Sequence, residues 1–259
     1  MTMASPLAEG TGDHAPAGHR IQLLPTPRRV RVFVDDVAVA DTTRAVLLRE
    51  GGPPPVYYFP HADLRADLMR ASATRSHCPF KGEASYWTLA VGDRLIEDAA
   101  WSYRRPLDAV AAIAGHVAFY WDRVDRWVEE EDEIIGHPRD PFVRIDVLNG
   151  SRPARVVLGG ETVAETQRPR ILFETGLRPR TYIPPEDVRM DLLRPSDKRS
   201  VCPYKGVARY WSARIGDRWF ENVVWSYPEP LAESGAIKGY LCFHDARGDG
   251  LSAGVAQPS

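Results

Sequence analysis

The sequence contains the same unit twice. When the chain is shifted by 124 positions, residues 31–121 align with residues 155–245 without a gap, and 40 of the 91 pairs are identical. A unit of this length can bury a hydrophobic core of its own, whereas the much shorter repeats of a solenoid cannot. The duplication therefore predicts two tandem domains that share one fold.

The ends of the alignment suggest the domain boundaries. We expect the first domain at residues 18–137 and the second at residues 142–246. Residues 1–17 and 247–259 are poor in large apolar side chains, and we expect both to be disordered tails. The N-terminal tail also lacks the basic and apolar regions of a secretion signal.

The first domain continues into a segment that the second lacks. Its apolar residues recur at helical spacing, and a glycine and a proline follow as a stop signal: Trp121, Val124, Val128, Ile135, Gly136 and Pro138. We expect a short connecting helix at about residues 121–135, with the acidic run 129–133 on its solvated face.

Within each unit the pattern is mainly β. Short β-branched runs such as "RVRVFV" and "ARVVL" alternate with turn residues, and two long strands flank a Gly-Asp pair in "ASYWTLAVGDRLIEDAAWSY" and "ARYWSARIGDRWFENVVWSY". Glycine at the first position of a two-residue loop favours a type II′ hairpin turn. We therefore expect two domains of antiparallel sheets.

Alternation of side chains along this hairpin separates two faces. One face is apolar and predicts core: Trp87, Leu89, Val91, Ile96 and Ala100, with Trp211, Ile215, Phe220 and Val224 in the second copy. The other face combines aromatic residues with a carboxylate: Tyr86, Glu97, Trp101 and Tyr103, with Tyr210, Glu221, Trp225 and Tyr227. This composition is typical of a small-molecule pocket. The alternative is a second layer of core, with Glu97 paired to an arginine at its rim.

The phrase Cys-Pro-aromatic-Lys-Gly precedes the hairpin in both copies, as "SHCPFKG" (76–82) and "SVCPYKG" (200–206). Only four of the 33 basic residues are lysines, and two of these occupy this phrase. Because a lysine is a compact, adaptable charge, the choice favours a role for Lys81 at the pocket, paired with Glu97. Arg75 and Arg199 lie beside the phrase and are further candidates for binding a ligand.

The same phrase permits catalysis. The Lys81 ammonium could stabilise a Cys78 thiolate as a nucleophile, with Glu97 or Tyr86 moving protons. The candidate catalytic set is therefore Cys78, Lys81 and Glu97, with Cys202, Lys205 and Glu221 in the second copy. The structural alternative is a buried cysteine followed by a proline and a glycine that shape a turn.

Several functions are excluded or disfavoured. No histidine occupies a matched position in both copies, which excludes a shared Ser-His-Asp or Cys-His unit, and without a Cys-x-x-Cys pair we expect no metal. No Gly-rich phosphate-binding phrase occurs, so we expect no cofactor. A net charge of −2 argues against nucleic acid, and the absence of a long apolar run argues against a membrane. We expect a cytoplasmic monomer or homodimer.

Both copies resemble a known family. The combination of Cys-Pro-x-Lys-Gly, Tyr-Trp and Trp-Ser-Tyr, together with "IAGHVAFYWDRVDRW" in the first copy and "TYIPPEDVRMDLL" in the second, is similar to the bacterial domain-of-unknown-function 427 family. The resemblance implies a β-tent-like fold, in which two antiparallel sheets meet at an angle with a pocket between them. Relatives of that group include a ligand-binding domain with an aromatic cage and several zinc proteins. The family also carries a nucleotidyltransferase-type name.

Three functions remain open from the sequence. The first is a duplicated domain that binds a small polar-aromatic or anionic molecule of unknown identity. The second is an enzyme using the Cys/Lys/Glu set or transferase chemistry of the nucleotidyl type. The third is a structural or scaffold protein whose matched polar residues form ion pairs on the surface.

Overall fold

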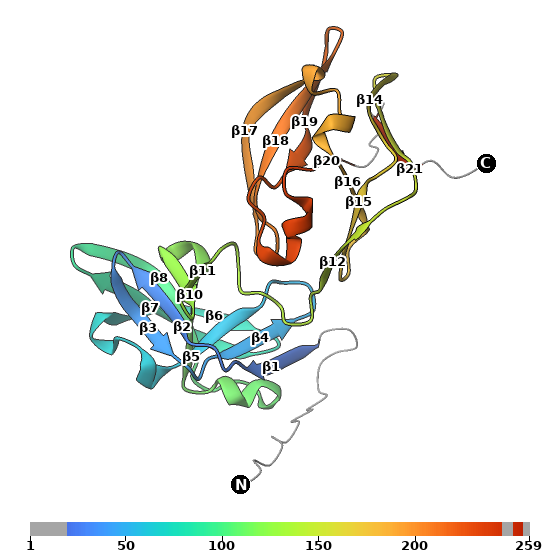
Figure 1. Ribbon diagram of the computed structural model, residues 1–259. Coiled ribbons are helices and arrows are strands. Elements are labelled where there is room, and N and C mark those ends of the chain that lie inside the picture. Colours follow the sequence, from blue (N-terminus) through green and yellow to red (C-terminus); the bar gives the residue numbers. More distant parts are fainter. Residues whose placement is uncertain (1–19, 245–250, 256–259) are drawn as a thin grey trace. The chain divides into compact units, whose positions relative to one another are not determined.

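The computed structural model describes residues 20–244 and the backbone of residues 251–255. The chain divides into two compact units on either side of the Pro138–Arg139 bond (Figure 1). The first predicted tail lies outside the described residues, as do 247–250 and 256–259 of the second.

The first unit consists of two antiparallel sheets. The larger has the strand order β1-β4-β5-β9-β8-β7-β6. Its strands are β1 (Ile21–Pro25), β4 (Val46–Glu50), β5 (Val56–Pro60), β6 (Met69–Cys78), β7 (Gly82–Val91), β8 (Arg94–Tyr103) and β9 (His116–Phe119). The smaller has the order β11-β10-β2-β3, with β2 (Val30–Val34), β3 (Val37–Thr42), β10 (Arg126–Glu129) and β11 (Asp132–Ile134). The predicted antiparallel β fold is confirmed.

Short 3-10 helices connect these strands. In the first unit they are η1 (His61–Asp63), η2 (Ala66–Leu68), η3 (Asp108–Ile113) and η4 (Trp121–Arg123). Ion pairs brace these connections: Arg65 bonds to Asp67 at 2.6 Å, and Arg44 bonds to Asp63 at 2.5 Å.

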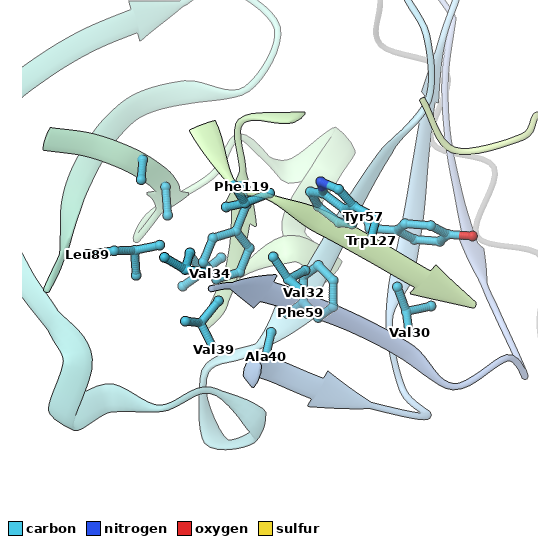
Figure 2. Packing of buried hydrophobic residues seen from close by; sticks show 14 of the residues in the cluster. Val30, Val32, Val34, Val39, Ala40, Tyr57, Phe59, Leu89, Phe119 and Trp127 are labelled. Carbon is cyan, nitrogen blue, oxygen red and sulfur yellow. The ribbon is translucent and has the colours of Figure 1, made fainter. Parts of the chain in front are cut away.

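The main core of the first unit lies between its two sheets (Figure 2). Along β2, Val30, Val32 and Val34 are fully buried and alternate with less buried residues. Each such side chain contributes roughly 1.5–3 kcal/mol on burial, which fixes this face of the strand toward the core. Phe59 from β5 and Trp127 from β10 pack beside them, with ring centroids 5.9 Å apart.

The β7–β8 hairpin forms as predicted at its tip. Its loop is Gly92-Asp93, and Gly92 has a φ of +55°, as the first position of a type II′ turn requires. Near the tip Leu89 pairs with Ile96, as a regular hairpin requires. Farther from the tip a bulge shifts the register, so that Trp87 pairs with Ala100. The predicted core face is confirmed, because its members pack in the cores of the two units.

The opposite face of the seven-stranded sheet carries a second cluster. Its buried members include Tyr58, Tyr103 and Ala118, and Tyr86 and Trp101 pack against them. Aromatic side chains from β5, β7 and β8 therefore gather on the face that does not meet the smaller sheet.

The helix predicted at about 121–135 is wrong. Trp121–Arg123 forms the single 3-10 turn η4, and β10 and β11 follow as a hairpin with Glu130 at a φ of +52°. β10 pairs with β2, and its Trp127 is 3% exposed. Pairing with β2 satisfies backbone groups along that strand, and this tertiary gain outweighs the local helical spacing.

The second unit repeats the architecture. Its larger sheet has the order β12-β15-β16-β20-β19-β18-β17. Its strands are β12 (Ile145–Asn149), β15 (Arg170–Glu174), β16 (Arg180–Ile183), β17 (Leu193–Cys202), β18 (Gly206–Ile215), β19 (Arg218–Ser226) and β20 (Leu241–Phe243). The smaller sheet has the order β14-β13-β21, with β13 (Ala154–Leu158), β14 (Glu161–Thr166) and β21 (Leu251–Val255). The connecting helices are η5 (Pro185–Asp187), η6 (Met190–Leu192) and η7 (Ala232–Ile237).

Strand β21 corrects the second predicted tail. Residues 251–255 pair antiparallel with β13, as β10 pairs with β2 in the first unit. A tail poor in large apolar side chains can still form a strand here, because the edge of β13 offers unpaired backbone groups.

Candidate functional site

The Cys-Pro-x-Lys-Gly phrase is the turn that joins β6 to β7. The Lys81 N–H donates to the Cys78 carbonyl at 3.2 Å, and Leu107 N–H donates to the Lys81 carbonyl at 3.1 Å. Gly82 has a φ of +98°, and a Cβ there would lie 3.3 Å from the Arg105 carbonyl oxygen. Glycine is therefore needed both for the backbone angle and for the close approach of the 105–107 segment.

The second repeat builds the same turn. Lys205 N–H donates to the Cys202 carbonyl at 3.3 Å, and Leu231 N–H donates to the Lys205 carbonyl at 3.1 Å. Gly206 has a φ of +102°, and a Cβ there would lie 3.1 Å from the Glu229 carbonyl oxygen. The repeated phrase thus encodes one local structure twice.

Lys81 forms an ion pair with Glu50 at the end of β4, and the pairing expected with Glu97 is wrong. The side chains of Lys81 and Glu50 are 12% and 14% exposed. Burial lowers the pKa of Lys81, because loss of water disfavours the charged form. In the second repeat Lys205 pairs with Glu174 at 2.5 Å.

A cavity of about 290 Å³ lies beside this ion pair in the first repeat. Five residues singled out in the sequence line it: Cys78, Lys81, Tyr86, Trp101 and Tyr103. The remaining lining residues were not predicted: Leu48, Glu50, Pro53, Pro54, Val56, Tyr58 and Tyr120. The cavity therefore lies on the aromatic face of the seven-stranded sheet and draws residues from strands far apart in the strand order.

Hydrogen bonds hold the aromatic side chains in place. Trp101 Nε1 donates to the Tyr58 hydroxyl at 3.3 Å, and the hydroxyls of Tyr86 and Ser76 are 2.7 Å apart. The ring of Tyr120 lies 4.5 Å from that of Trp101, centroid to centroid. These contacts leave little freedom to the walls of the cavity.

The phenols of Tyr58, Tyr103 and Tyr120 stay protonated at neutral pH. Burial raises the pKa of Tyr58 and of Tyr103 well above the usual value near 10. Burial, followed by a hydrogen bond with Tyr86, raises the pKa of Tyr120 to about 12. The cavity thus offers neutral hydroxyl groups that can both donate and accept hydrogen bonds.

Glu97 and Arg75 lie outside the cavity lining. Glu97 is exposed and belongs to the bulge of β8, where the backbone departs from simple pairing. Its expected place rested on a hairpin without that bulge. Arg75 is also exposed and donates to the backbone carbonyls of Ser72 and Thr74, so it braces the bulge of β6.

The matching residues of the second repeat behave similarly. Glu221 is exposed and accepts a hydrogen bond from Ser212 at 2.7 Å. Arg199 donates to the carbonyls of Ser196 and Lys198. The four residues therefore lie at bulges in the long strands, and the two arginines brace them.

Cys78 is part of the cavity wall. It is half-buried and hydrogen-bonds with Tyr103. Of the two groups expected to move protons for it, Glu97 lies outside the cavity and Tyr86 bonds to Ser76. The expected ammonium partner, Lys81, is held by Glu50.

The second repeat keeps the framework of this site. Tyr182, Tyr210, Trp225 and Tyr227 are buried in one cluster, with Cys202 packed against them. Trp225 Nε1 donates to the Tyr182 hydroxyl at 3.4 Å, and Ser200 and Tyr210 hydroxyls are 2.8 Å apart. These bonds match those of the first repeat residue by residue.

The two repeats differ at the rim. Where the first has Val56 and Tyr120, the second has Arg180 and His244. The Arg180 guanidinium lies over the Trp225 ring at 5.8 Å, and the His244 ring is 4.8 Å from it. The second site therefore carries additional basic side chains against its tryptophan.

The unpredicted residues differ in how well they could be found. Glu50 and Tyr58 are identical in the two copies, as Glu174 and Tyr182, so the alignment marked them, although nothing in it placed them beside Lys81. Tyr120 aligns with His244 in the second copy, so the comparison of the copies does not mark it.

Within the part of the chain that the structure describes, no group of three or more His, Cys, Asp or Glu side chains could hold a metal ion. Among the lining residues of the cavity, Glu50 is the single carboxylate, and nucleotidyl transfer would need a set of carboxylates for its metal ions.

Among the described helices, none is long and apolar enough to span a membrane.

Fold and site together define a tandem pair of antiparallel β domains, each with a Lys–Glu pair beside buried tyrosines and a tryptophan. A family model matches residues 22–130 and again 146–254, and its description is domain of unknown function (DUF427). The chain belongs to this family and carries two copies of its domain. No curated protein matches the chain.

Proposed function

We propose that the first repeat binds a small molecule in the cavity between Lys81 and Trp101. The observation that carries this proposal is the convergence of four tyrosines, one tryptophan and one ion pair on a single space of about 290 Å³. Ligand sites combine apolar walls with a few placed polar groups, and this cavity has both.

The polar groups suggest the kind of ligand. The Lys81 ammonium has three donors, so it keeps capacity after bonding to Glu50. The neutral hydroxyl of Tyr120 adds a group of either kind. A ligand with a flat apolar body and an edge that both donates and accepts hydrogen bonds complements these walls.

The second repeat has the same framework but should prefer a ligand of different charge. Arg180 against Trp225 adds a permanent positive charge that Val56 does not supply. We expect the second site to favour an anionic ligand over the neutral ligand of the first.

Binding is the simpler role for Cys78 as well. Its thiol lies in the cavity wall, and the ammonium that would activate it is bonded to a carboxylate. A nucleophile needs a base within hydrogen-bond reach, and the expected one, Glu97, lies outside the lining.

The test is a screen of small heteroaromatic compounds by thermal shift, followed by calorimetry. Tyr86→Phe removes one hydroxyl from the first cavity, and Tyr210→Phe removes the matched hydroxyl of the second repeat. For a ligand of the first cavity, Tyr86→Phe should weaken binding roughly three- to tenfold, while Tyr210→Phe leaves it unchanged. Equal effects of the two substitutions, or no binder among the compounds, would contradict the proposal.

A further inference from the structure

A second cavity of the first repeat lies on the other face of its large sheet. It measures about 250 Å³, and its lining includes His61, Trp87, Ser102, Arg104 and His116. Trp87 belongs to the face that packs toward the main core, whereas Tyr86 and Trp101 belong to the aromatic face described above. The two cavities therefore differ in all their lining residues except Tyr103, which belongs to both.

The ends of two neighbouring strands place the histidines. β5 ends at Pro60, which pairs with His116 at the start of β9, and His61 N–H donates to the Gly115 carbonyl at 2.9 Å. His116 Nδ1 lies 3.0 Å from the Ala114 carbonyl, so this nitrogen carries the proton. In the imidazolium form Nε2 carries a second proton, which a ligand can accept.

Trp87 provides the apolar wall of this cavity. The His61 ring lies 5.9 Å from the Trp87 ring, and the Arg104 guanidinium lies 5.8 Å from its centroid. Trp87 Nε1 donates to Ser102 Oγ at 3.3 Å, and Ser102 is buried. The Ser102 hydroxyl keeps its own hydrogen for donation.

The charge of this lining is positive. Its lining residues include one arginine and two histidines but no carboxylate. Asp63 lies close enough to His116 for the two to interact electrostatically. The Asp63 carboxylate, however, accepts hydrogen bonds from Thr42 and Arg44. An anion entering the cavity would therefore meet donors without a competing acid in the wall.

The second repeat keeps the structural residues of this cavity but not its basic side chains. It keeps the counterparts of Trp87, Ser102 and Gly115, as Trp211, Ser226 and Gly239. It replaces the three basic side chains, with Pro185 for His61, Pro228 for Arg104 and Tyr240 for His116. The fold thus forms without these groups, which points to a role other than stability in the first repeat.

We propose that this cavity binds a small organic anion, a carboxylate on a compact apolar body. Arg104 would bond to both carboxylate oxygens, since a planar guanidinium matches that geometry. His116 Nε2, which carries a proton in the imidazolium form, and the Ser102 hydroxyl would donate further hydrogen bonds, and the apolar body would lie against Trp87. This proposal does not rest on the function proposed for the cavity beside Lys81, although Tyr103 lines both cavities.

The test uses the full chain and benzoate as the probe, with benzamide as its neutral analogue and inorganic phosphate as an anion without an apolar body. Calorimetry gives the affinities, and the indole N–H signal of Trp87, assigned with Trp87→Phe, reports the location. Benzoate should bind and shift that signal, with benzamide and phosphate each at least about tenfold weaker.

Variants decide the contribution of the basic groups. Arg104→Gln should weaken benzoate binding about tenfold or more, and the adjacent Arg105→Gln, which makes the same charge change outside the lining, should stay within about twofold. His116→Tyr introduces the residue that the second repeat uses, so it should fold normally and also weaken binding. The proposal is overturned if benzoate does not bind, if phosphate binds as tightly, or if Arg104→Gln and Arg105→Gln behave alike.

Discussion

Lys81 bonds to Glu50 although their strands are not neighbours in the sheet. Glu50 ends β4, Lys81 lies in the turn between β6 and β7, and strands β5, β9 and β8 lie between β4 and β7 in the strand order. In a flat sheet β4 and β7 would be about 19 Å apart, too far for these side chains to meet. The sheet therefore curls around the cavity, and the pair joins its two halves. Lys205 and Glu174 repeat the relationship.

This ion pair should contribute to stability. Lys81→Met leaves the Glu50 carboxylate without its lysine, and we expect a loss of roughly 2 kcal/mol in urea unfolding. That is less than the roughly 3–5 kcal/mol of a fully buried pair, because water still reaches both side chains. Arg65→Met serves as the control, because it breaks the exposed pair with Asp67 and should leave the free energy of unfolding almost unchanged. Equal losses in the two variants would show that the Lys81 pair has no special role.

The glycine of the repeated phrase should resist substitution. Gly82→Ala combines a positive φ with a Cβ that would lie 3.3 Å from the Arg105 carbonyl oxygen, so it should destabilise by more than about 1 kcal/mol. Gly52→Ala has a similar φ of +110° but no neighbour within 4 Å, and it isolates the cost of the backbone angle. Thermal unfolding should rank Gly82→Ala as the more harmful change, and the reverse order would refute the close-approach argument.

Trp127 tests the β10 hairpin against the predicted helix. It is 3% exposed and packs with Phe59 and Phe119, so Trp127→Ala should cost about 3–5 kcal/mol. Trp219 is 46% exposed, and Trp219→Ala should change the free energy of unfolding by less than about 1 kcal/mol. Chemical denaturation of both variants gives the comparison. A small effect at Trp127 would be incompatible with a strand that inserts it into the core.

The tyrosines should ionise late on alkaline titration. Burial raises the pKa of Tyr58 and Tyr103 and brings that of Tyr120 to about 12, against a usual value near 10 in the unfolded chain. A raised folded-state pKa favours the protonated form. The stability it supplies is therefore complete below about pH 10 and is lost as pH rises toward 12. Absorbance at 295 nm should show these phenols ionising together with unfolding, and their free titration near pH 10 in the folded protein would contradict their burial.

The sequence was sufficient for those features that depend on local pattern or on duplication. Alternation along the hairpin separated Leu89 from Tyr86, and the glycine at position 92 identified the turn. The same alternation could not reveal the bulge after Leu89, so Glu97 was expected at the pocket. Bulges depend on how the strand bends against its neighbours, which period-two patterns do not record.

Long-range pairing explains the other differences. Glu50 lies 31 positions before Lys81, and only the curl of the sheet brings them together. Trp121, Val124 and Val128 have helical spacing, yet Val128 lies in a strand because β10 pairs with the edge of β2. In both cases the deciding contacts come from distant segments.

The cavity beside Lys81 is the proposed binding site, and the indole N–H signal of Trp101 tests that proposal most directly. That group donates to Tyr58 at 3.3 Å in the cavity wall, and Trp101→Phe assigns its signal. On titration with the tightest compound from the screen, the Trp101 signal should shift and saturate with the affinity measured by calorimetry. An unchanged Trp101 signal at full saturation would show that the compound binds elsewhere and would contradict the proposed function.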